Sequence, residues 1–493
     1  MKLIIMIALA MSVVGSIGYA QTASAPKPGS VDAVIAEIKN PVDWFTWGGD
    51  LRLRNEYFNN ALTLSKTVVR HEQDYFRFRE RLWLALQPVT NLNVTARITG
   101  EERDWMRPAF TRQFDNAQGG DGRYGIMDNA YLKWSNVFDQ PLTLTAGRQD
   151  IQLGDPLNWW LVMDGTPYDG SWTFFFDSVR GTYNLSEIQT KFDFIYIYQN
   201  ALPDEWIPTI GPSGNNQYPK GAAPYWLTEQ TEQGAIVYLT NKSLKNTEID
   251  GYFIYKGDNR VHTDILPNGD DADIFTIGGK VTGNPWEHVK YSAEGAYQFG
   301  RKNDPMLVHD DSGVSVNRGI DAFGVNSSLS YLCKDSLDNQ FSVSFEYLTG
   351  DNPKTTGRDE MFDILWGRWP RWSELYIYSY PVETAGKIAQ LNDIMRIGPS
   401  WNITPIKDTT FSATYNALFA PEGVPTRATV PTATVPTRFE GGNFRGHYLQ
   451  TVLKHQFNKY ISGHLWGEWV WQGDFYVRRD LMTFLRAELM FKF

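Results

Sequence analysis

The sequence has one cysteine, Cys333, so no disulfide can form within the chain. It also lacks long apolar runs: beyond the first twenty residues, no stretch approaches the roughly 20 apolar residues that a helical membrane span needs. These absences exclude a disulfide-stabilised secreted module and a helical membrane protein. The formal net charge is −10, which argues against nucleic acid as a partner.

Motifs of known enzyme classes are missing as well. The sequence contains no G-x-S-x-G, Walker A, H-E-x-x-H or C-x-x-C pattern. Three of the seven histidines, His447, His455 and His464, fall near the last strands but lack metal-binding spacing. We therefore expect no catalytic site, no metal and no cofactor. A membrane hydrolase that pairs His464 with a strand serine remains a third alternative.

The N-terminal residues 1–20 have the form of a secretory signal peptide. One cation, Lys2, precedes an apolar run, and Gly18 and Ala20 precede the expected cleavage before Gln21. An uncleaved anchor is the alternative, although the run is short for a spanning helix. Residues 21–43 are expected to form a periplasmic tether, in which Val31, Val34, Ile35 and Ile38 recur at helical spacing.

The last thirteen residues read as an amphipathic strand that ends on Phe493. Because side chains alternate along a strand, Leu485, Ala487, Leu489, Phe491 and Phe493 share one face, and Phe484, Arg486, Glu488, Met490 and Lys492 share the other. One face suits lipid and the other suits water, as in an outer-membrane β-barrel. The edge strand of a soluble sandwich is the alternative.

The same period-two pattern continues from Trp47 to the end of the chain, and predicts about eighteen strands. Short links, such as Gly283–His288, alternate strictly with long ones, such as Asn200–Glu232 and Asp351–Leu391. A barrel with both ends in the periplasm needs this alternation of short periplasmic turns and long extracellular loops. The aromatic content of 14% suits two interfacial girdles. We therefore predict an all-β protein: one transmembrane antiparallel up-and-down β-barrel over residues 44–493.

Charged side chains on the polar faces of the strands are expected to line the lumen, since lipid offers them no partner. Six arginines on three consecutive predicted strands would form a basic wall: Arg52, Arg54, Arg77, Arg79, Arg81 and Arg97. Such a wall suits an anionic solute that carries carboxylates. A structural ladder, in which these arginines pair with Asp50, Glu56 and Glu101, is the alternative. Further predicted lining residues have mixed signs, as is ordinary for a porin: Lys191, Asp193, Lys290, Glu294, Glu346, Arg486 and Glu488.

Two segments resemble the alginate export porin family: L-T-L-T-A-G-R-Q-D-I-Q-L-G-D at residues 142–155 and F-F-D-S-V-R-G-T-Y-N at residues 175–184. The matched positions are Arg148, Asp155, Asp177 and Arg180, and Ser178 stands where the family usually has glycine. The resemblance implies an 18-stranded outer-membrane barrel whose arginine-rich constriction passes a polyuronate.

The sequence thus predicts an outer-membrane channel of a Gram-negative bacterium that conducts an anionic, alginate-like polysaccharide out of the periplasm. The alternative is a substrate-selective uptake porin for small organic acids or sugars. Expected partners are the anionic polymer or its oligomers, outer-membrane lipid and lipopolysaccharide, and a periplasmic export scaffold.

Overall fold

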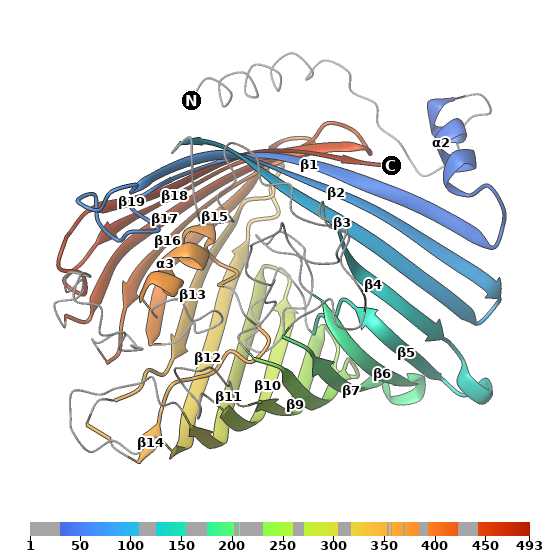
Figure 1. The fold of residues 1–493 in the computed structure, drawn as a ribbon, viewed down its shortest axis with the longest axis horizontal. Helices are drawn as coiled ribbons and strands as arrows, with labels where there is room; N and C mark the ends of the chain where they lie inside the picture. The colour runs from blue at the N-terminus through green and yellow to red at the C-terminus, as the bar shows by residue number, and fades with distance from the viewer. Residues whose placement is uncertain are drawn as a thin grey trace.

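Nineteen strands form one continuous sheet in the computed structural model (Figure 1). The structure describes residues 30–107, 125–153, 175–201, 207, 230–259, 271–303, 317–352, 354–355, 357–367, 370–383, 393–422 and 442–493. The strands are β1 (Phe45–Asn59), β2 (Glu72–Val89), β3 (Leu92–Arg107), β4 (Gly125–Trp134), β5 (Leu142–Gln149), β6 (Phe176–Leu185), β7 (Thr190–Gln199), β8 (Glu232–Asn241), β9 (Thr247–Asp258), β10 (Asp271–Trp286), β11 (Val289–Asn303), β12 (Asn317–Leu332), β13 (Gln340–Leu348), β14 (Arg358–Asp359), β15 (Ile394–Ile406), β16 (Thr409–Phe419), β17 (Phe444–Gln456), β18 (Ile461–Gln472) and β19 (Leu481–Lys492).

The sheet closes on itself. β1 pairs with β2 on one side and with β19 on the other, so neither terminal strand is left as an edge. β14 is a two-residue strand that pairs in parallel with β12, and the other eighteen strands form the antiparallel wall. The predicted up-and-down barrel and its strand number are therefore confirmed.

The two rims of the barrel differ in their connections, as predicted. Turns such as the one between β10 and β11, where Trp286 pairs with Val289, gather at one end, which we call the short-turn rim. The C-terminal residue, Phe493, also lies there: its amide donates to the carbonyl of Gly49 at 3.1 Å, and Gly49 lies in the part of β1 that pairs with the end of β2 next to the β2–β3 turn. The longer connections leave the opposite end, which we call the long-loop rim.

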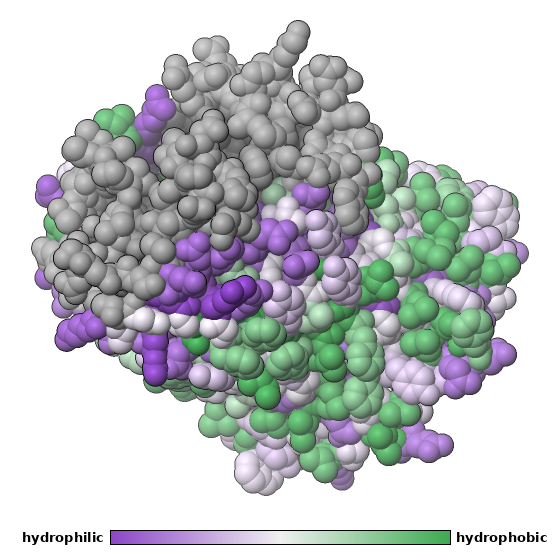
Figure 2. All heavy atoms as spheres, turned by 60° about the horizontal axis from the view of Figure 1, so that its bottom comes forward, coloured by the Kyte–Doolittle hydropathy of each residue, from purple (hydrophilic) through white to green (hydrophobic). Residues whose placement is uncertain are grey.

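Alternation of side chains separates two faces of the wall. On β12, the outward residues Phe323 and Leu329 are 46% and 59% exposed, whereas the inward residues Ala322 and Asn326 are 0% and 1% exposed. Figure 2 shows hydrophobic residues gathered over a broad area of the outer face, with hydrophilic residues at its margins. This pattern fits a wall whose outer surface meets hydrocarbon.

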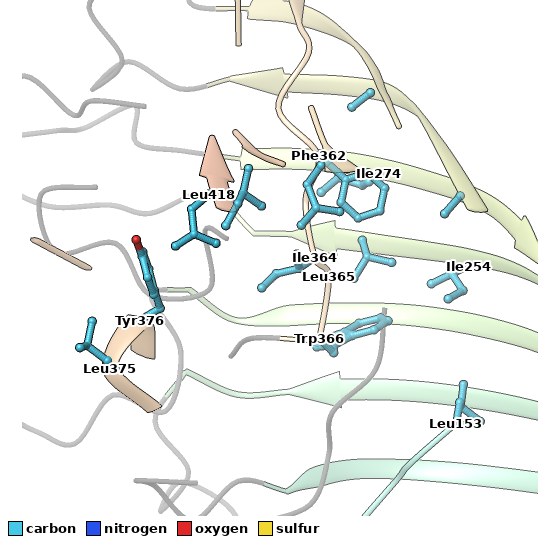
Figure 3. Packing of buried hydrophobic residues seen from close by; sticks show 14 of the residues in the cluster. Leu153, Ile254, Ile274, Phe362, Ile364, Leu365, Trp366, Leu375, Tyr376 and Leu418 are labelled. Carbon is cyan, nitrogen blue, oxygen red and sulfur yellow. The ribbon is translucent and has the colours of Figure 1, made fainter. Parts of the chain in front are cut away.

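The buried apolar cluster lies inside the barrel. The connection between β13 and β15, expected from the sequence to be an outer loop, folds inward over much of its described length. It contributes Phe362, Leu365, Trp366, Leu375 and Tyr376, all fully buried. Figure 3 shows Phe362, Ile364, Leu365 and Trp366 carried on one segment across the inner faces of the strands. Gly234 of β8 permits the close approach, since a Cβ there would lie 2.3 Å from the Trp366 ring.

Within the described residues, two α-helices accompany the sheet, α2 (Val31–Lys39) and α3 (Glu374–Glu383), with short 3-10 turns η1 (Val137–Asp139) and η2 (Ser186–Ile188). The predicted helical spacing near Val31 is confirmed by α2. Its Asp32 accepts hydrogen bonds from Lys459 and Tyr460 in the turn between β17 and β18, at 2.6 and 2.7 Å. The hydrogen bond from Lys459 to Asp32 raises the pKa of this lysine. The helix is therefore held on the short-turn rim.

Neither α2 nor α3 is long and apolar enough to cross a membrane, and the same holds for every helical segment within the described ranges. The proposed signal peptide, residues 1–20, lies outside them.

Substitution of an outward wall residue tests the facing of the sheet. Val237 lies in the middle of β8 and is 42% exposed on the outer face. Arginine at a bilayer midplane costs about 2–4 kcal/mol, so Val237→Arg is expected to lower the free energy of unfolding from lipid vesicles by an amount of that order. Urea titration monitored by heat-modifiable gel mobility measures it.

The matched control is Thr240→Arg on the same strand, because Thr240 lines an internal cavity with room for a polar side chain. Equal destabilisation by both substitutions would contradict the assigned facing.

Candidate functional site

The inward segment is tied first to the wall formed by β8–β12. The amide of Asp363 donates to Gln298 at 2.8 Å, and the Gln298 side chain returns a hydrogen bond to the Asp363 carbonyl at 2.6 Å. Trp366 donates its indole N–H to Glu232 at 3.0 Å. Arg318 binds Asp351 and Asp359 at 2.7 and 3.1 Å. Polar and ionic contacts thus fix the described residues between Asp351 and Trp366 to this side of the barrel.

The same connection is tied to the opposite side through α3. Glu468 of β18 accepts from the Ser373 hydroxyl at 2.6 Å and from the amides of Glu374 and Leu375, both at 2.9 Å. These bonds satisfy N–H groups that the first turn of a helix leaves unpaired. Glu374 in turn binds Arg486 of β19 at 2.6 Å. The connection therefore bridges the interior between two walls and narrows it.

Five of the six arginines of the predicted wall lie on β1 and β2, near the seam between β1 and β19, and each stands close to a carboxylate. Arg54 is hydrogen-bonded to Glu488, and Arg77 to Glu101. Asp50 accepts from Arg81 at 2.7 Å and lies 3.5 Å from Arg79. The side chains of Arg52, Arg54 and Arg77 are 0% exposed. These contacts form an ion-pair ladder, which is the structural alternative to a basic wall that binds an anionic solute.

Arg52 is the least compensated member of this ladder. Its closest carboxylate oxygen, on Glu101, is 4.0 Å away, and none of its three guanidinium nitrogens has a hydrogen-bond partner within the described part of the chain. Arg79 faces it across the β1–β2 register. Arg52 and Arg79 carry like charges, and no carboxylate of the described residues is hydrogen-bonded to Arg52. Positive charge therefore accumulates at this point of the inner wall.

Arg97, at the end of the predicted wall, belongs to a separate cluster. It binds Asp128 at 2.8 Å and Asp150 at 3.0 Å, and its side chain keeps 15% exposure. Like Arg81, whose side chain is also 15% exposed, it reaches the interior more freely than the covered side chains of Arg52 and Arg54 do.

Of the four positions that the sequence resemblance singled out, two pair with each other and a third pairs with Asp193. Arg148 donates from Nε and Nη2 to the two oxygens of Asp177, at 2.9 and 3.0 Å, and lies over the Phe175 ring at 4.1 Å. Arg180 binds Asp193 at 2.9 Å and keeps 21% exposure. Asp155 lies outside the described residues. The first pair is thus enclosed, whereas Arg180 is accessible.

Open space inside the barrel follows β4–β11 at the short-turn end. One cavity of about 820 Å³ is lined by residues that include Lys191, Lys242, Tyr238 and Glu248. A second, of about 470 Å³, is lined by residues that include Lys133, Asp150, Arg180 and Lys191. A third cavity, of about 420 Å³, is lined by residues that include Lys290. Among the described residues, five cations and two carboxylates therefore line these three cavities.

Sequence reasoning placed Lys191 and Lys290 only as ordinary lining and missed Lys133 and Lys242. The signal for Lys133 was available: it shares the parity of Asn129 and Tyr131 on β4, and all three line the second cavity. Lys242 follows the end of β8, where alternation no longer predicts a direction.

One of the candidate histidines, His464, lies against a carboxylate. The imidazole Nδ1 of His464 lies 3.3 Å from a Glu488 oxygen in the ladder. Across the described ranges, no group of three or more His, Cys, Asp or Glu side chains is arranged to hold a metal ion.

Removing the carboxylate that caps α3 tests the bridge. Glu468→Ala leaves the amides of Glu374 and Leu375 without their acceptor. Loss of a helix cap costs about 0.5–2 kcal/mol, so these amides are expected to exchange with deuterium roughly 2- to 30-fold faster. Hydrogen exchange read by mass spectrometry measures this effect, and Glu248→Ala in the cavity wall is the control. Unchanged exchange in Glu468→Ala would rule out the proposed tether.

Comparison with solved structures places the barrel among porins. A BenF-like porin from Pseudomonas fluorescens Pf-5 is similar at 12% identity, with 90% of this chain and 98% of that chain covered and a TM-score of 0.51. Acinetobacter baumannii OccAB2 (11% identity, 91% and 98% covered, TM-score 0.51) and Pseudomonas aeruginosa OccK8 (OprE) (10% identity, 91% and 98% covered, TM-score 0.50) are also similar. At such identities the likeness is one of fold. No curated protein sequence matches the chain.

A family model described as alginate export matches residues 228–487, which is more than half of the chain. The match begins just before β8 and runs into β19, so it includes both anchor points of the inward segment, Trp366 and Glu468. Together with the closed porin-like barrel, it locates the protein in the outer membrane of a Gram-negative bacterium. The chain belongs to the alginate export family.

Proposed function

We propose that this outer-membrane channel conducts an anionic polysaccharide, an alginate-like polyuronate, out of the periplasm. The observation that carries the proposal is the cation excess among the described residues that line the cavities along β4–β11. Lys133, Arg180, Lys191, Lys242 and Lys290 stand against Asp150 and Glu248 on the lining and against Asp193, which pairs with Arg180 and Lys191. The short-turn rim faces the periplasm in such a barrel, so these cations would meet the solute first.

Two kinds of positive charge would act on the solute in different ways. The accessible groups, Arg81, Arg97 and Arg180 with 15–21% side-chain exposure, would contact its carboxylates directly. The enclosed ladder, Arg52, Arg54, Arg77 and Arg79, would act through its field, since its guanidinium groups are covered. Several weak, spaced cationic positions lower the barrier for a repeating carboxylate and still allow its release.

The enclosed pair Arg148 and Asp177 would have a structural role in this scheme, because each satisfies the other. Asp193 would orient Arg180 toward the second cavity. A periplasmic export scaffold would approach at the rim that carries α2.

Uptake of a small organic acid or sugar is the second candidate. The size of the cavities favours it, since volumes of about 420–820 Å³ match the 300–1,000 Å³ typical of sites for small molecules.

Planar-bilayer recording separates the two functions. Under a salt gradient, the wild-type channel is expected to show an anion-selective reversal potential, and oligouronates added on the periplasmic side should reduce the current more strongly as their length grows. Block by monouronate equal to block by oligouronate would instead favour small-acid uptake. A cation-selective pore that is insensitive to uronates would contradict both polyuronate export and small-acid uptake.

The cation excess is tested by the quadruple variant Lys133→Gln, Arg180→Gln, Lys191→Gln and Lys290→Gln. We expect its anion preference and its oligouronate block to fall several-fold, because the fixed charges that attract carboxylates are gone. A charge-matched control replaces four exposed turn lysines outside the cavities with glutamine: Lys245, Lys334, Lys407 and Lys459. An equal loss of selectivity in the control would contradict the assignment of the pathway.

A further inference from the structure

The outer face of the barrel carries a repeated contact near the long-loop rim, in which a tyrosine and an arginine share one carboxylate. Asp273 accepts from Tyr255 and from Arg301, both at 2.8 Å. Asp321 accepts from Tyr297 at 3.0 Å and from Arg358 at 2.8 Å. Each contact joins neighbouring strands among β9–β12 and β14. The repetition indicates a built surface rather than one chance ion pair.

The two arginines of this surface point into open space. Their side chains are 74% exposed for Arg301 and 66% exposed for Arg358. Asp273 engages only the Nε and Nη2 atoms of Arg301, and Asp321 accepts from Nη1 of Arg358. Because a guanidinium has five N–H donors, each arginine keeps donors for a ligand. The carboxylates hold the groups in place without covering them.

Gly319 creates a gap between the two arginines. It pairs in register with Arg301 on β11 and with Arg358 on β14, so it lies between them on the outer face. A Cβ at this position would meet no atom of the described residues closer than 4.0 Å. Two strand spacings separate the arginine Cα atoms, roughly 10 Å. The result is an open notch with a guanidinium group on either side.

A row of aromatic rings lies directly beneath the notch on the same outer face. Phe275 and Phe299 stack with centroids 5.5 Å apart, and Tyr297 lies 6.2 Å from Phe299. Phe323 continues the row on β12, with Tyr347 stacked on it at 5.4 Å. Phe299 and Phe323 are 40% and 46% exposed. Figure 2 shows the hydrophobic surface and its hydrophilic margin. The notch therefore stands where hydrocarbon gives way to headgroups.

We propose that this notch binds a phosphate group of a glycolipid in the outer leaflet, with the lipid's acyl chains on the aromatic row. Arginine matches phosphate oxygens with two parallel donors, and the boundary between rings and charges fits an amphiphile with a phosphorylated head. The site is independent of the solute pathway, because it lies on the opposite face of the wall.

A third contact of the same kind provides a matched control. Tyr57 and Arg107 share Glu72 on β1–β3, and Arg107 is 63% exposed. Within the described residues, no comparable row of stacked rings accompanies it. Arg107→Gln therefore removes an equivalent exposed arginine without touching the notch.

Native mass spectrometry of the purified full chain in detergent tests the proposal, with bisphosphorylated lipid A and its dephosphorylated form as the two probes. The wild type is expected to retain the phosphorylated lipid at least about tenfold better than the dephosphorylated one. The double variant Arg301→Gln, Arg358→Gln should lose this preference, and Arg107→Gln should keep it. Gel mobility before and after heating verifies that each variant is a folded barrel.

The notch itself is tested with Gly319→Asp, which places a negative charge between the arginines, and with Gly319→Ala, which adds only a methyl group. Retention of the phosphorylated lipid is expected to fall for Gly319→Asp and to stay unchanged for Gly319→Ala. The proposal is overturned if the wild type does not distinguish the two lipids, if the double variant retains as much as the wild type, or if Arg107→Gln loses as much as the double variant.

Discussion

The pairing of β1 with β19 is the constraint on which the rest of the structure depends. Inside a membrane, an unpaired strand edge would leave backbone N–H and C=O groups without partners, so the sheet must close. The register at this seam runs from Asp50 opposite Lys492 to Asn59 opposite Thr483. Arg54 and Glu488 face each other there, as do Glu56 and Arg486. A shift by two residues would bring Arg54 opposite Arg486, and the repulsion between like charges would oppose it.

The same seam explains why so many arginines are enclosed without any role as free cations. Arg54, Arg77 and Arg486 each have a carboxylate partner on a neighbouring strand or on α3. A compensated pair exerts a weaker field at a distance than a lone charge does. The groups that remain accessible to a solute are Arg81 on β2, Arg97 on β3 and the cations along β4–β11, and the incompletely paired Arg52 adds to their field. The electrostatics of the channel are therefore divided between a structural side and an open side.

The architecture could be predicted from the sequence because the membrane imposes it residue by residue. Alternation of Arg77, Arg79 and Arg81 with Phe78 and Leu82 fixes both the strand and its facing, and the rhythm of short and long links fixes the topology. The positions of charges on the inner wall were thus foreseeable. Their partners were not, because the pairing of Arg54 with Glu488 depends on contacts across more than four hundred residues of sequence.

The inward connection could not be predicted for a related reason. Phe362, Leu365 and Trp366 look like apolar residues in a loop, and nothing nearby in the sequence reveals that Gly234 and Glu232 receive the tryptophan. The likeness of residues 142–155 and 175–184 to the export family singled out Arg148 and Asp177. It did not show that these two residues bind each other.

The connection fixed at Trp366 on one side and at Glu468 on the other also has a mechanical consequence. A cylinder of eighteen strands resists stretching along its strands, but its circular outline flattens easily under sideways pressure from the surrounding bilayer. A strut that joins distant points of the circumference holds that diameter. We therefore expect the spacing between these two points to depend on the chain itself more than on the membrane around it.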